Sequence, residues 1–287
     1  FDKLPFWGQM TTHGLLPGLG PTYGINYVND SAATASAWAT GQKTIEGRIS
    51  EGPSTALSVP GADLRSVMLD AKAAGKRTAN ISDVDLTDAT PAAMGASIND
   101  RSCQGPQNMG ACPAARKVNG GKGSIAEQLV DNGIDVLLGG GRARFTQNID
   151  AGGTLLARAT STLGYREVTT KQALAGITSL DQGPVLGLFA GGYMATRFQP
   201  LVATASGSGS TSYRCQPNTR GDQPTLAEMT AKALELVDNP NGFFMQVESA
   251  QTDKAAHDAN LCGSLGQVAE ADKALEGLLE YQRTHPD

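Results

Sequence analysis

Apolar residues along this chain alternate between two spacings, one typical of helices and the other of short strands. Helical spacing predicts a helix that begins at Ser31 and further helices over residues 63–76, 124–133, 225–238 and 265–283. Two of these helices, 124–133 and 225–238, open with Ser or Thr followed three residues later by Glu, which is the pattern of a capping box. Short apolar runs predict strands over residues 77–84, 134–141 and 242–249, the last two of them buried.

The alternation of helices with short apolar strands indicates an α/β fold with a largely parallel sheet. Residues 1–28 are rich in Gly and Pro and should form loop with at most one short strand, while residues 87–91 should form a loop after strand 77–84. The "SGSGSTS" stretch at 206–212 is interpreted as a flexible loop, because helix and strand patterns resume on both sides. We therefore expect residues 1–287 to form a single domain, with its chemistry at the carboxyl ends of the strands.

Composition and charge exclude some classes of function for this chain. Apolar residues make up 40% of the chain, which is typical of a globular protein. The net charge is −5 and no basic stripe is present, which argues against a nucleic-acid partner. The longest apolar runs, such as residues 184–194, are far too short to span a bilayer, so no membrane span is expected.

Four cysteines favour two disulfides and an oxidising compartment: Cys103, Cys112, Cys215 and Cys262. Zinc binding by thiolates is disfavoured because no C-x₂-C pair exists. Three pairings are possible, and a Cys103–Cys112 bond would close a short loop and leave Cys215 for Cys262. The chain shows neither an initiator Met nor a signal peptide, and we expect that processing or truncation removed whatever came first. The expected location is periplasmic or secreted.

The stretch "NDSAATASAWATGQKT" at residues 29–44 places Asp30 and Ser31 at the start of a helix. One interpretation is an N-cap, because Asp and Ser oxygens accept hydrogen bonds from the unpaired N–H groups of the first turn. The other is a nucleophile, because a helix N-terminus attracts anions and a Ser there could attack a phosphate or acyl group held by those N–H groups. Taken alone, the stretch favours the cap and leaves both interpretations open.

Residues 246–260, "QVESAQTDKAAHDAN", contain three side chains of types that bind metal ions in proteins. Asp253 and His257 are four residues apart, which places both side chains on one face of a helix, where they could share one divalent ion such as zinc. Glu248 ends the preceding strand and could join them, because strand ends converge in a parallel sheet. The alternative is an exposed hydrogen-bonded pair on a helix surface.

Residues 85–101 hold a second group of candidates. Asp88 and Thr90 follow a strand, where a carboxylate and a hydroxyl could bind a hard cation such as magnesium, directly or through water. The planar fork of Arg101 suits two oxygens of a phosphate. The alternative is that Asp88 and Thr90 are turn and cap residues, and that Arg101 is a solvated surface charge.

Together, these segments resemble the alkaline phosphatases of the bacterial type. The motifs that carry the resemblance occur in the family's order and spacing: "NDSAATASAWATGQKT", "DATPAA" followed by Arg101, "GGKGSIAEQL", "DVLLGGG" and "FFMQVESAQTDKAAHDAN". The resemblance covers nearly the whole chain. It implies a three-layer α/β sandwich in which a central, mostly parallel β-sheet is flanked by helices.

The resemblance also implies a role for each matched residue. Ser31 would be the nucleophile that takes the phosphoryl group, facing one zinc, while Asp30 would help to hold Arg101 against the phosphate oxygens. The other implied positions are Asp253 and His257 as ligands of a second zinc, Thr90 and Glu248 as ligands of magnesium, and Asp88 and Lys254 as neighbours of the phosphate site. The Asp88 and Lys254 combination is the form found in magnesium-dependent bacterial members.

The activity implied by the resemblance is hydrolysis of small phosphate monoesters to inorganic phosphate by a homodimer that holds Zn²⁺ and Mg²⁺. Members of the family carry further metal ligands before the segment that matches residue 1 and after the segment that matches residue 287. We therefore expect these residues to be part of a longer enzyme, and to be inactive or nearly so alone. The rival functions are a phosphodiesterase or sulfatase of the same superfamily, and a non-catalytic secreted protein that binds phosphate or a partner.

Overall fold

The computed structural model describes residues 2, 4, 8–202 and 214–285, so the predicted loop at 206–212 lies outside the described residues. The strands are β1 (Gly14–Leu15), β2 (Ile25–Asn26), β3 (Arg77–Asp85), β4 (Val136–Gly140), β5 (Arg166–Val168), β6 (Val185–Leu188) and β7 (Phe243–Glu248). The α-helices are α1 (Ser31–Thr40), α2 (Val67–Ala73), α3 (Ala89–Gly95), α4 (Ile125–Asp131), α5 (Arg142–Phe145), α6 (Leu155–Ser161), α7 (Lys171–Ala175), α8 (Leu226–Val237), α9 (Gln251–His257) and α10 (Leu261–Thr284). Three short 3₁₀ turns lie between Met109 and Asn119.

Five strands form one parallel sheet in the order β5-β6-β4-β3-β7, as the alternating pattern predicts. Successive side chains of β4 point to opposite faces of this sheet. Val136 and Leu138 join one apolar cluster, and Leu137 joins the other. Because both faces of β4 and β6 are covered, the sequences of these two strands are continuously apolar rather than alternating, whereas β3 carries several buried polar residues.

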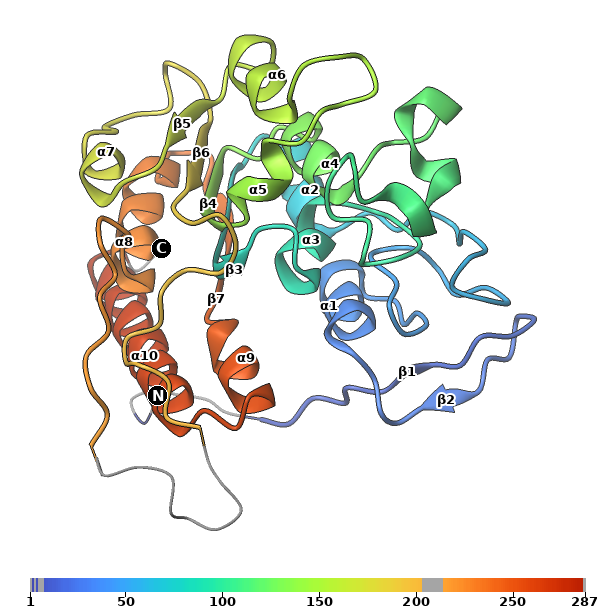
Figure 1. The fold of residues 1–287 in the computed structure, drawn as a ribbon, viewed down its shortest axis with the longest axis horizontal. Helices are drawn as coiled ribbons and strands as arrows, with labels where there is room; N and C mark the ends of the chain where they lie inside the picture. Colours follow the sequence, from blue (N-terminus) through green and yellow to red (C-terminus); the bar gives the residue numbers. More distant parts are fainter. Residues whose placement is uncertain (1, 3, 5–7, 203–213, 286–287) are drawn as a thin grey trace.

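Helices cover the two faces of the sheet and make three layers, which confirms the predicted fold class (Figure 1). Apolar residues of α1, α3, α4 and α6 pack with one face of the sheet, and those of α7, α8 and α10 pack with the other. The carboxyl ends of β3 and β7 therefore open toward the starts of α3 and α9, which follow them in the chain. Chemistry in folds of this kind collects at that edge.

Both capping boxes form as predicted. Ser124 accepts a hydrogen bond from the N–H of Glu127 at the start of α4, while the Glu127 carboxylate accepts one from the N–H of Ser124. Thr225 and Glu228 make the same reciprocal pair at the start of α8. These local contacts satisfy donors that the helix itself leaves unpaired, so they depend little on the rest of the fold.

Five predictions differ in detail from the structure. The segment 1–28 contains two short strands, β1 and β2, which pair with each other, rather than one. Residues 87–91 are not a loop throughout, because α3 already begins at Ala89. The helix predicted over 63–76 is limited to α2, because the Ser66 hydroxyl caps it by accepting from the N–H of Leu69. The last helix begins earlier than expected, at Leu261. Strand β7 is half-buried rather than buried, since it lies at the edge of the sheet and pairs with β3 alone among the described residues.

Two disulfides join the four cysteines, in the pairing that closes one short loop. Cys103 is bonded to Cys112 and Cys215 to Cys262, with sequence separations of 9 and 47 residues. The described helices include none that combines the length and the apolar character required to cross a membrane.

Candidate functional site

The start of α1 separates the two roles that the sequence left open for Asp30 and Ser31. Asp30 is the N-cap, because its Oδ1 accepts a hydrogen bond of 3.1 Å from the N–H of Ala33. Ser31 is the first residue of the helix, and its hydroxyl is not used for capping. The capping interaction therefore leaves Ser31 Oγ available at the positive end of the helix.

The Arg101 side chain lies directly against this helix start. Its Nη1 donates to Asp30 Oδ2 at 2.9 Å and to Ser31 Oγ at 2.8 Å. Burial by itself would lower the pKa of Arg101, but the hydrogen bond to Asp30 and the charges of Asp88 and Asp30 outweigh it and raise the pKa. A full positive charge is thus fixed beside a hydroxyl oxygen, an arrangement that favours negative charge on that oxygen or on a ligand next to it.

Asp88 connects Arg101 to α9. Its Oδ1 accepts from Arg101 Nη2 at 2.9 Å and from the N–H of Ala89 at 2.8 Å, so Asp88 caps α3. Its Oδ2 lies 2.9 Å from Lys254 Nζ. Burial would raise the pKa of Asp88, but the hydrogen bond and charge of Lys254, the N–H of Ala89 and the charge of Arg101 hold it below the ordinary value. Asp88 therefore acts as a carboxylate that bridges two cations.

These contacts make one continuous network from four separate elements. The residues in it are Asp30 and Ser31 on α1, Arg101 in the segment after α3, Asp88 at the start of α3, and Lys254 on α9. Arg101 is held in place because its N–H bonds to the carbonyl of Gly47 and the Cys103 disulfide follows two residues later. The predicted phosphate-binding residues are brought together by this network.

Glu248 and Thr90 meet at the ends of β7 and the start of α3. Ser82 Oγ donates to Glu248 Oε2 at 2.7 Å, and the Thr90 side chain hydrogen-bonds to the same carboxyl group. Burial raises the pKa of Glu248 to about 7, although both hydroxyl groups oppose the shift, and the charges of Asp83 and Asp88 add to it. A nearby cation would stabilise the negative charge of the Glu248 carboxylate. Together with the hydroxyls of Ser82 and Thr90, this carboxylate forms an oxygen donor set of the kind that fits magnesium.

Asp253 and His257 lie on one exposed face of α9, as predicted. Asp253 Oδ1 is 3.4 Å from His257 Nε2, and their side chains are 60% and 76% exposed. An oxygen and an imidazole nitrogen fit zinc, but a zinc site needs three or four ligands. No cluster of three or more His, Cys, Asp and Glu side chains suited to a metal ion occurs within residues 2, 4, 8–202 and 214–285. The pair therefore fits zinc as part of a larger ligand set.

Two neighbours of the site were not identified from the sequence. Ser82 is one of several polar residues in β3, and only its parallel register opposite Glu248 makes it a partner of that carboxylate. Tyr193 lies beyond β6, and its ring centroid is 5.7 Å from Lys254 Nζ. Its position after a strand end was a usable signal, because residues after parallel strands gather at one edge.

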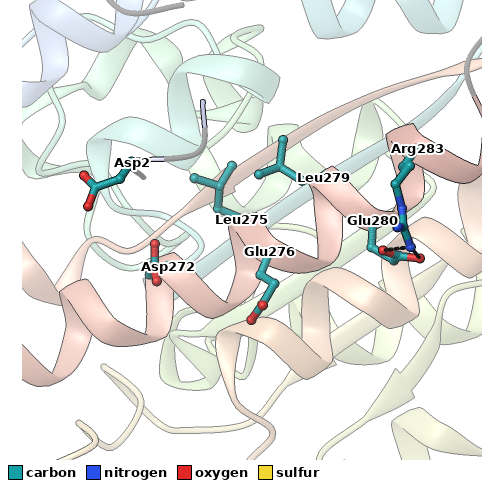
Figure 2. Close-up of a pocket in the computed structure, with 7 residues that line it drawn as sticks. All are labelled: Asp2, Asp272, Leu275, Glu276, Leu279, Glu280 and Arg283. Atoms are coloured by element: carbon teal, nitrogen blue, oxygen red, sulfur yellow. Dashed lines mark hydrogen bonds and ion pairs between the residues drawn. The ribbon is translucent and has the colours of Figure 1, made fainter. Parts of the chain in front are cut away.

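The hollow drawn in Figure 2 lies elsewhere, along the outer side of α10, and has a volume of about 600 Å³. Its lining residues are Asp2, Asp272, Leu275, Glu276, Leu279, Glu280 and Arg283. The single cation among them, Arg283, is paired with Glu280. Because four carboxylates line this hollow, it repels anions and is not the phosphate site.

The fold and the hydrogen-bond network around Arg101 together define a class of protein. It is a three-layer α/β protein that gathers a serine hydroxyl, a guanidinium, an ammonium and several carboxylates at the carboxyl edge of a parallel sheet. A helix N-terminus beside a fixed cation is suited to bind a phosphate or a similar anion.

Comparison with known proteins gives the family. The family model described as "Alkaline phosphatase" matches residues 1–286. The alkaline phosphatase of Escherichia coli (strain K12) is 40% identical over 98% of this chain and 60% of its own length, and alkaline phosphatase H of Pseudomonas aeruginosa (strain UCBPP-PA14) is 40% identical over 98% and 59%. The crystal structure of a cold-active alkaline phosphatase from the psychrophile Shewanella sp. superposes with a TM-score of 0.68 at 26% identity, covering 100% of this chain and 60% of the other.

The chain belongs to the alkaline phosphatase family. It spans about 60% of the length of the curated relatives that it matches. The resemblance inferred from the motifs is therefore confirmed, and the fold that it implied is the one observed.

Proposed function

We propose that this chain is the phosphate-binding part of a phosphate monoester hydrolase that works through a phosphoserine at Ser31. The observation that carries the proposal is the 2.8 Å contact between Arg101 Nη1 and Ser31 Oγ at the start of α1. Membership of the alkaline phosphatase family supports hydrolysis of monoesters over diesters or sulfate esters. The two disulfides support a periplasmic or secreted protein.

In this proposal, Ser31 Oγ attacks phosphorus opposite the ester oxygen. The phosphorus–ester oxygen bond breaks, the alcohol leaves and takes up a proton, and the serine proton passes to solvent. Arg101 binds two phosphoryl oxygens and compensates the charge that they carry in the transition state. Water then hydrolyses the phosphoserine, which releases inorganic phosphate and restores the Ser31 hydroxyl.

Asp253 with His257 would contribute ligands to zinc, and Thr90 with Glu248 would contribute ligands to magnesium. When bound, these ions would supply positive charge that stabilises the serine and leaving-group oxygens. Lys254 and Asp88 balance each other's charge beside the phosphate, which leaves Arg101 and the bound ions to compensate the charge of the dianion. Since the described residues provide only part of a zinc ligand set, we propose that hydrolysis needs ligands from outside them.

The proposal is tested by titrating the 287-residue chain with inorganic phosphate, followed by ³¹P NMR or calorimetry. The wild-type chain should bind phosphate, Arg101→Ala should lose binding by about tenfold or more, and Ser31→Ala should keep the fold and most of the affinity. In the longer protein, Ser31→Ala should abolish hydrolysis of an aryl monoester and the phosphoserine adduct seen by mass spectrometry. Faster turnover of an aryl diester or sulfate would favour the phosphodiesterase or sulfatase alternative. Full activity of the Ser31→Ala variant would exclude the mechanism.

We also propose that the protein is a homodimer. Large apolar side chains stand exposed on the segment around β1 and β2, among them Leu19 at 82% and Val28 at 86%. Contiguous exposed apolar surface is typical of protein interfaces. Sedimentation velocity should find a dimer for the wild type and a larger monomer fraction for Leu19→Asp with Val28→Asp, whereas a wild-type monomer at high micromolar concentration would contradict the proposal.

A further inference from the structure

A cleft of about 300 Å³ includes Lys254 in its wall. It lies between the segment after β6 and the helix α9. Its lining includes Tyr193, Met194, Ala255 and Asp258. Lys254 belongs both to this cleft and, through Asp88, to the network that holds Arg101 and Ser31.

Tyr193 offers an aromatic surface on the wall of this cleft. Its side chain is 50% exposed, and its hydroxyl has no hydrogen-bond partner among the described residues. The ring centroid lies 5.7 Å from Lys254 Nζ, so one side of the ring faces the ammonium group while much of the remainder is accessible. A half-exposed aromatic ring in a cleft suits stacking with a flat ligand group.

The backbone that carries Tyr193 is fixed by its neighbours. The N–H of Met194 donates to the carbonyl of Asp83 at 3.1 Å, and the Gln251 side chain donates to the carbonyl of Met194. The N–H of Ala195 donates to Gln223 Oε1 at 2.7 Å. The ring is therefore presented from a rigid segment, which reduces the entropy lost when a ligand stacks on it.

Most polar groups of the cleft wall are already occupied. Gln251 bonds to Met194, the Asn260 side chain accepts from the N–H of Leu201 and the N–H of Gly263, and Asn218 donates to Thr196. These groups hold the fold and leave the Tyr193 ring as the main recognition surface. The cleft wall thus combines the Lys254 ammonium group, which also contacts Asp88, with the ring of Tyr193.

We propose that Tyr193 is a specificity-determining residue that stacks with the alcohol part of the substrate, and that the protein prefers phosphate monoesters of aromatic or other flat alcohols. This inference rests on the proposed phosphate site at Arg101 and Ser31. In this proposal, the alcohol of an ester whose phosphate lies against Arg101 extends toward Lys254, which Asp88 links to Arg101, and into the cleft that Lys254 lines. The preference is a property of binding and does not require the metal ions.

Non-hydrolysable phosphonates test the inference by binding alone. The 287-residue chain is titrated with inorganic phosphate, methylphosphonate and phenylphosphonate. Wild type should bind phenylphosphonate about three- to tenfold more tightly than methylphosphonate, the range expected for aromatic stacking. Tyr193→Ala should reduce this ratio to about one, while Tyr193→Phe should keep it because the ring remains. Tyr27→Ala is the control: it removes an exposed tyrosine that is not part of the cleft wall, and it should leave the ratio unchanged.

The outcomes separate the two proposals. If inorganic phosphate binds but phenylphosphonate has no advantage, or if Tyr193→Ala keeps the advantage, the role of Tyr193 is overturned and the phosphate site stands. If neither phosphate nor either phosphonate binds, both proposals are overturned. Should Tyr193→Ala fail to fold, as judged by circular dichroism, Tyr193→Leu preserves bulk without the ring and gives the same comparison.

Discussion

A single guanidinium group, that of Arg101, joins two helix starts in this protein. It contacts the residues that begin α1 and the residue that caps α3, and each contact is a charge-assisted hydrogen bond of 2.8 to 2.9 Å. A planar fork with several N–H donors can reach both sides at once, which an ammonium group cannot. The geometry at this position therefore depends on the shape of the side chain as well as its charge.

Replacing Arg101 by Lys keeps the charge and tests the shape. We expect Arg101→Lys to weaken binding of inorganic phosphate by about tenfold, because one ammonium cannot bridge Asp30 and Asp88 and still face a ligand. Calorimetric titration measures the change. Arg142→Lys on α5, where the arginine pairs with Glu167, is the matched control and should bind like wild type. Equal affinity for Arg101→Lys would show that charge alone suffices.

A second arginine has a purely structural function. Arg48 is fully buried and donates to the carbonyls of Gly52, Ala56 and Leu57 and to the hydroxyl of Ser54. It organises the irregular segment between α1 and α2 by satisfying oxygens that would otherwise be buried without partners.

Removing that guanidinium should destabilise the fold strongly. We expect Arg48→Met to lower the free energy of unfolding by about 3 kcal/mol or more, since several buried acceptors lose their donor. Urea denaturation gives the value. Arg65→Met removes an exposed ion pair with Asp70 and should change stability by only about 0.5 kcal/mol. Similar losses for the two variants would contradict this account of Arg48.

At the scale of single elements, side chains at helix starts decide where helices begin. Asp88 starts α3 inside a stretch that the sequence pattern assigned to a loop, and Ser66 delays the start of α2. Each cap satisfies an N–H group of the first turn. In α8 the cap also carries a charge, because Glu228 of its capping box pairs with Lys171.

The α8 capping box should make stability depend on pH in the acid range. Burial would raise the pKa of Glu228, but the hydrogen bonds from Lys171 and from Thr225 lower it below its ordinary value of 4.5. A carboxyl with a lowered pKa in the folded state adds stability above its unfolded pKa and loses it as the pH falls through the folded pKa. Glu228→Gln keeps an oxygen that can accept from the N–H of Thr225 but removes the charge and the acceptor of Lys171. The variant should be less stable than wild type near neutral pH, and the gap should close below about pH 4.

Urea denaturation between pH 3 and 7 measures that gap. Thr225→Ser keeps both the hydroxyl and the Glu228 charge, so its stability should follow that of wild type across the range. A gap of constant size at all pH values would show that the ion pair with Lys171 does not contribute.

At the scale of the whole molecule, the two disulfides close loops of different lengths. Cys103–Cys112 closes a loop beside Arg101, whereas Cys215–Cys262 joins the segment before α8 to the start of α10. A cross-link restricts the unfolded chain more when the loop that it closes is longer.

Removing each disulfide separately should therefore have unequal effects. Replacing Cys215 and Cys262 by Ala should cost about 4 kcal/mol, and replacing Cys103 and Cys112 by Ala about 3 kcal/mol, from loop closure alone. Free energies of unfolding from urea titration measure both. A larger loss for the shorter loop would show that its native contacts, where Cys103 and Cys112 are buried, outweigh the effect on the unfolded chain.

Much of the fold could be predicted from the sequence because it depends on neighbours along the chain. Apolar spacing identified β3, β4 and β7, and the S-x-x-E and T-x-x-E patterns identified both capping boxes. The i,i+4 spacing of Asp253 and His257 placed them on one face of α9. The family motifs identified the candidate site residues, and the roles given to these residues stay predictions.

The sequence by itself determined the order and type of five helices and three strands, and the family; it left three cysteine pairings open. Only the tertiary structure decided that Asp30 caps α1 while Ser31 Oγ accepts from Arg101, that Asp88 bridges Arg101 and Lys254, and that Tyr193 lies beside Lys254. Periodicity and caps arise within one or two helical turns, so they are visible in a short window. The contacts of Arg101 join residues 13 to 71 positions apart, and such contacts are set by the order of strands in the sheet.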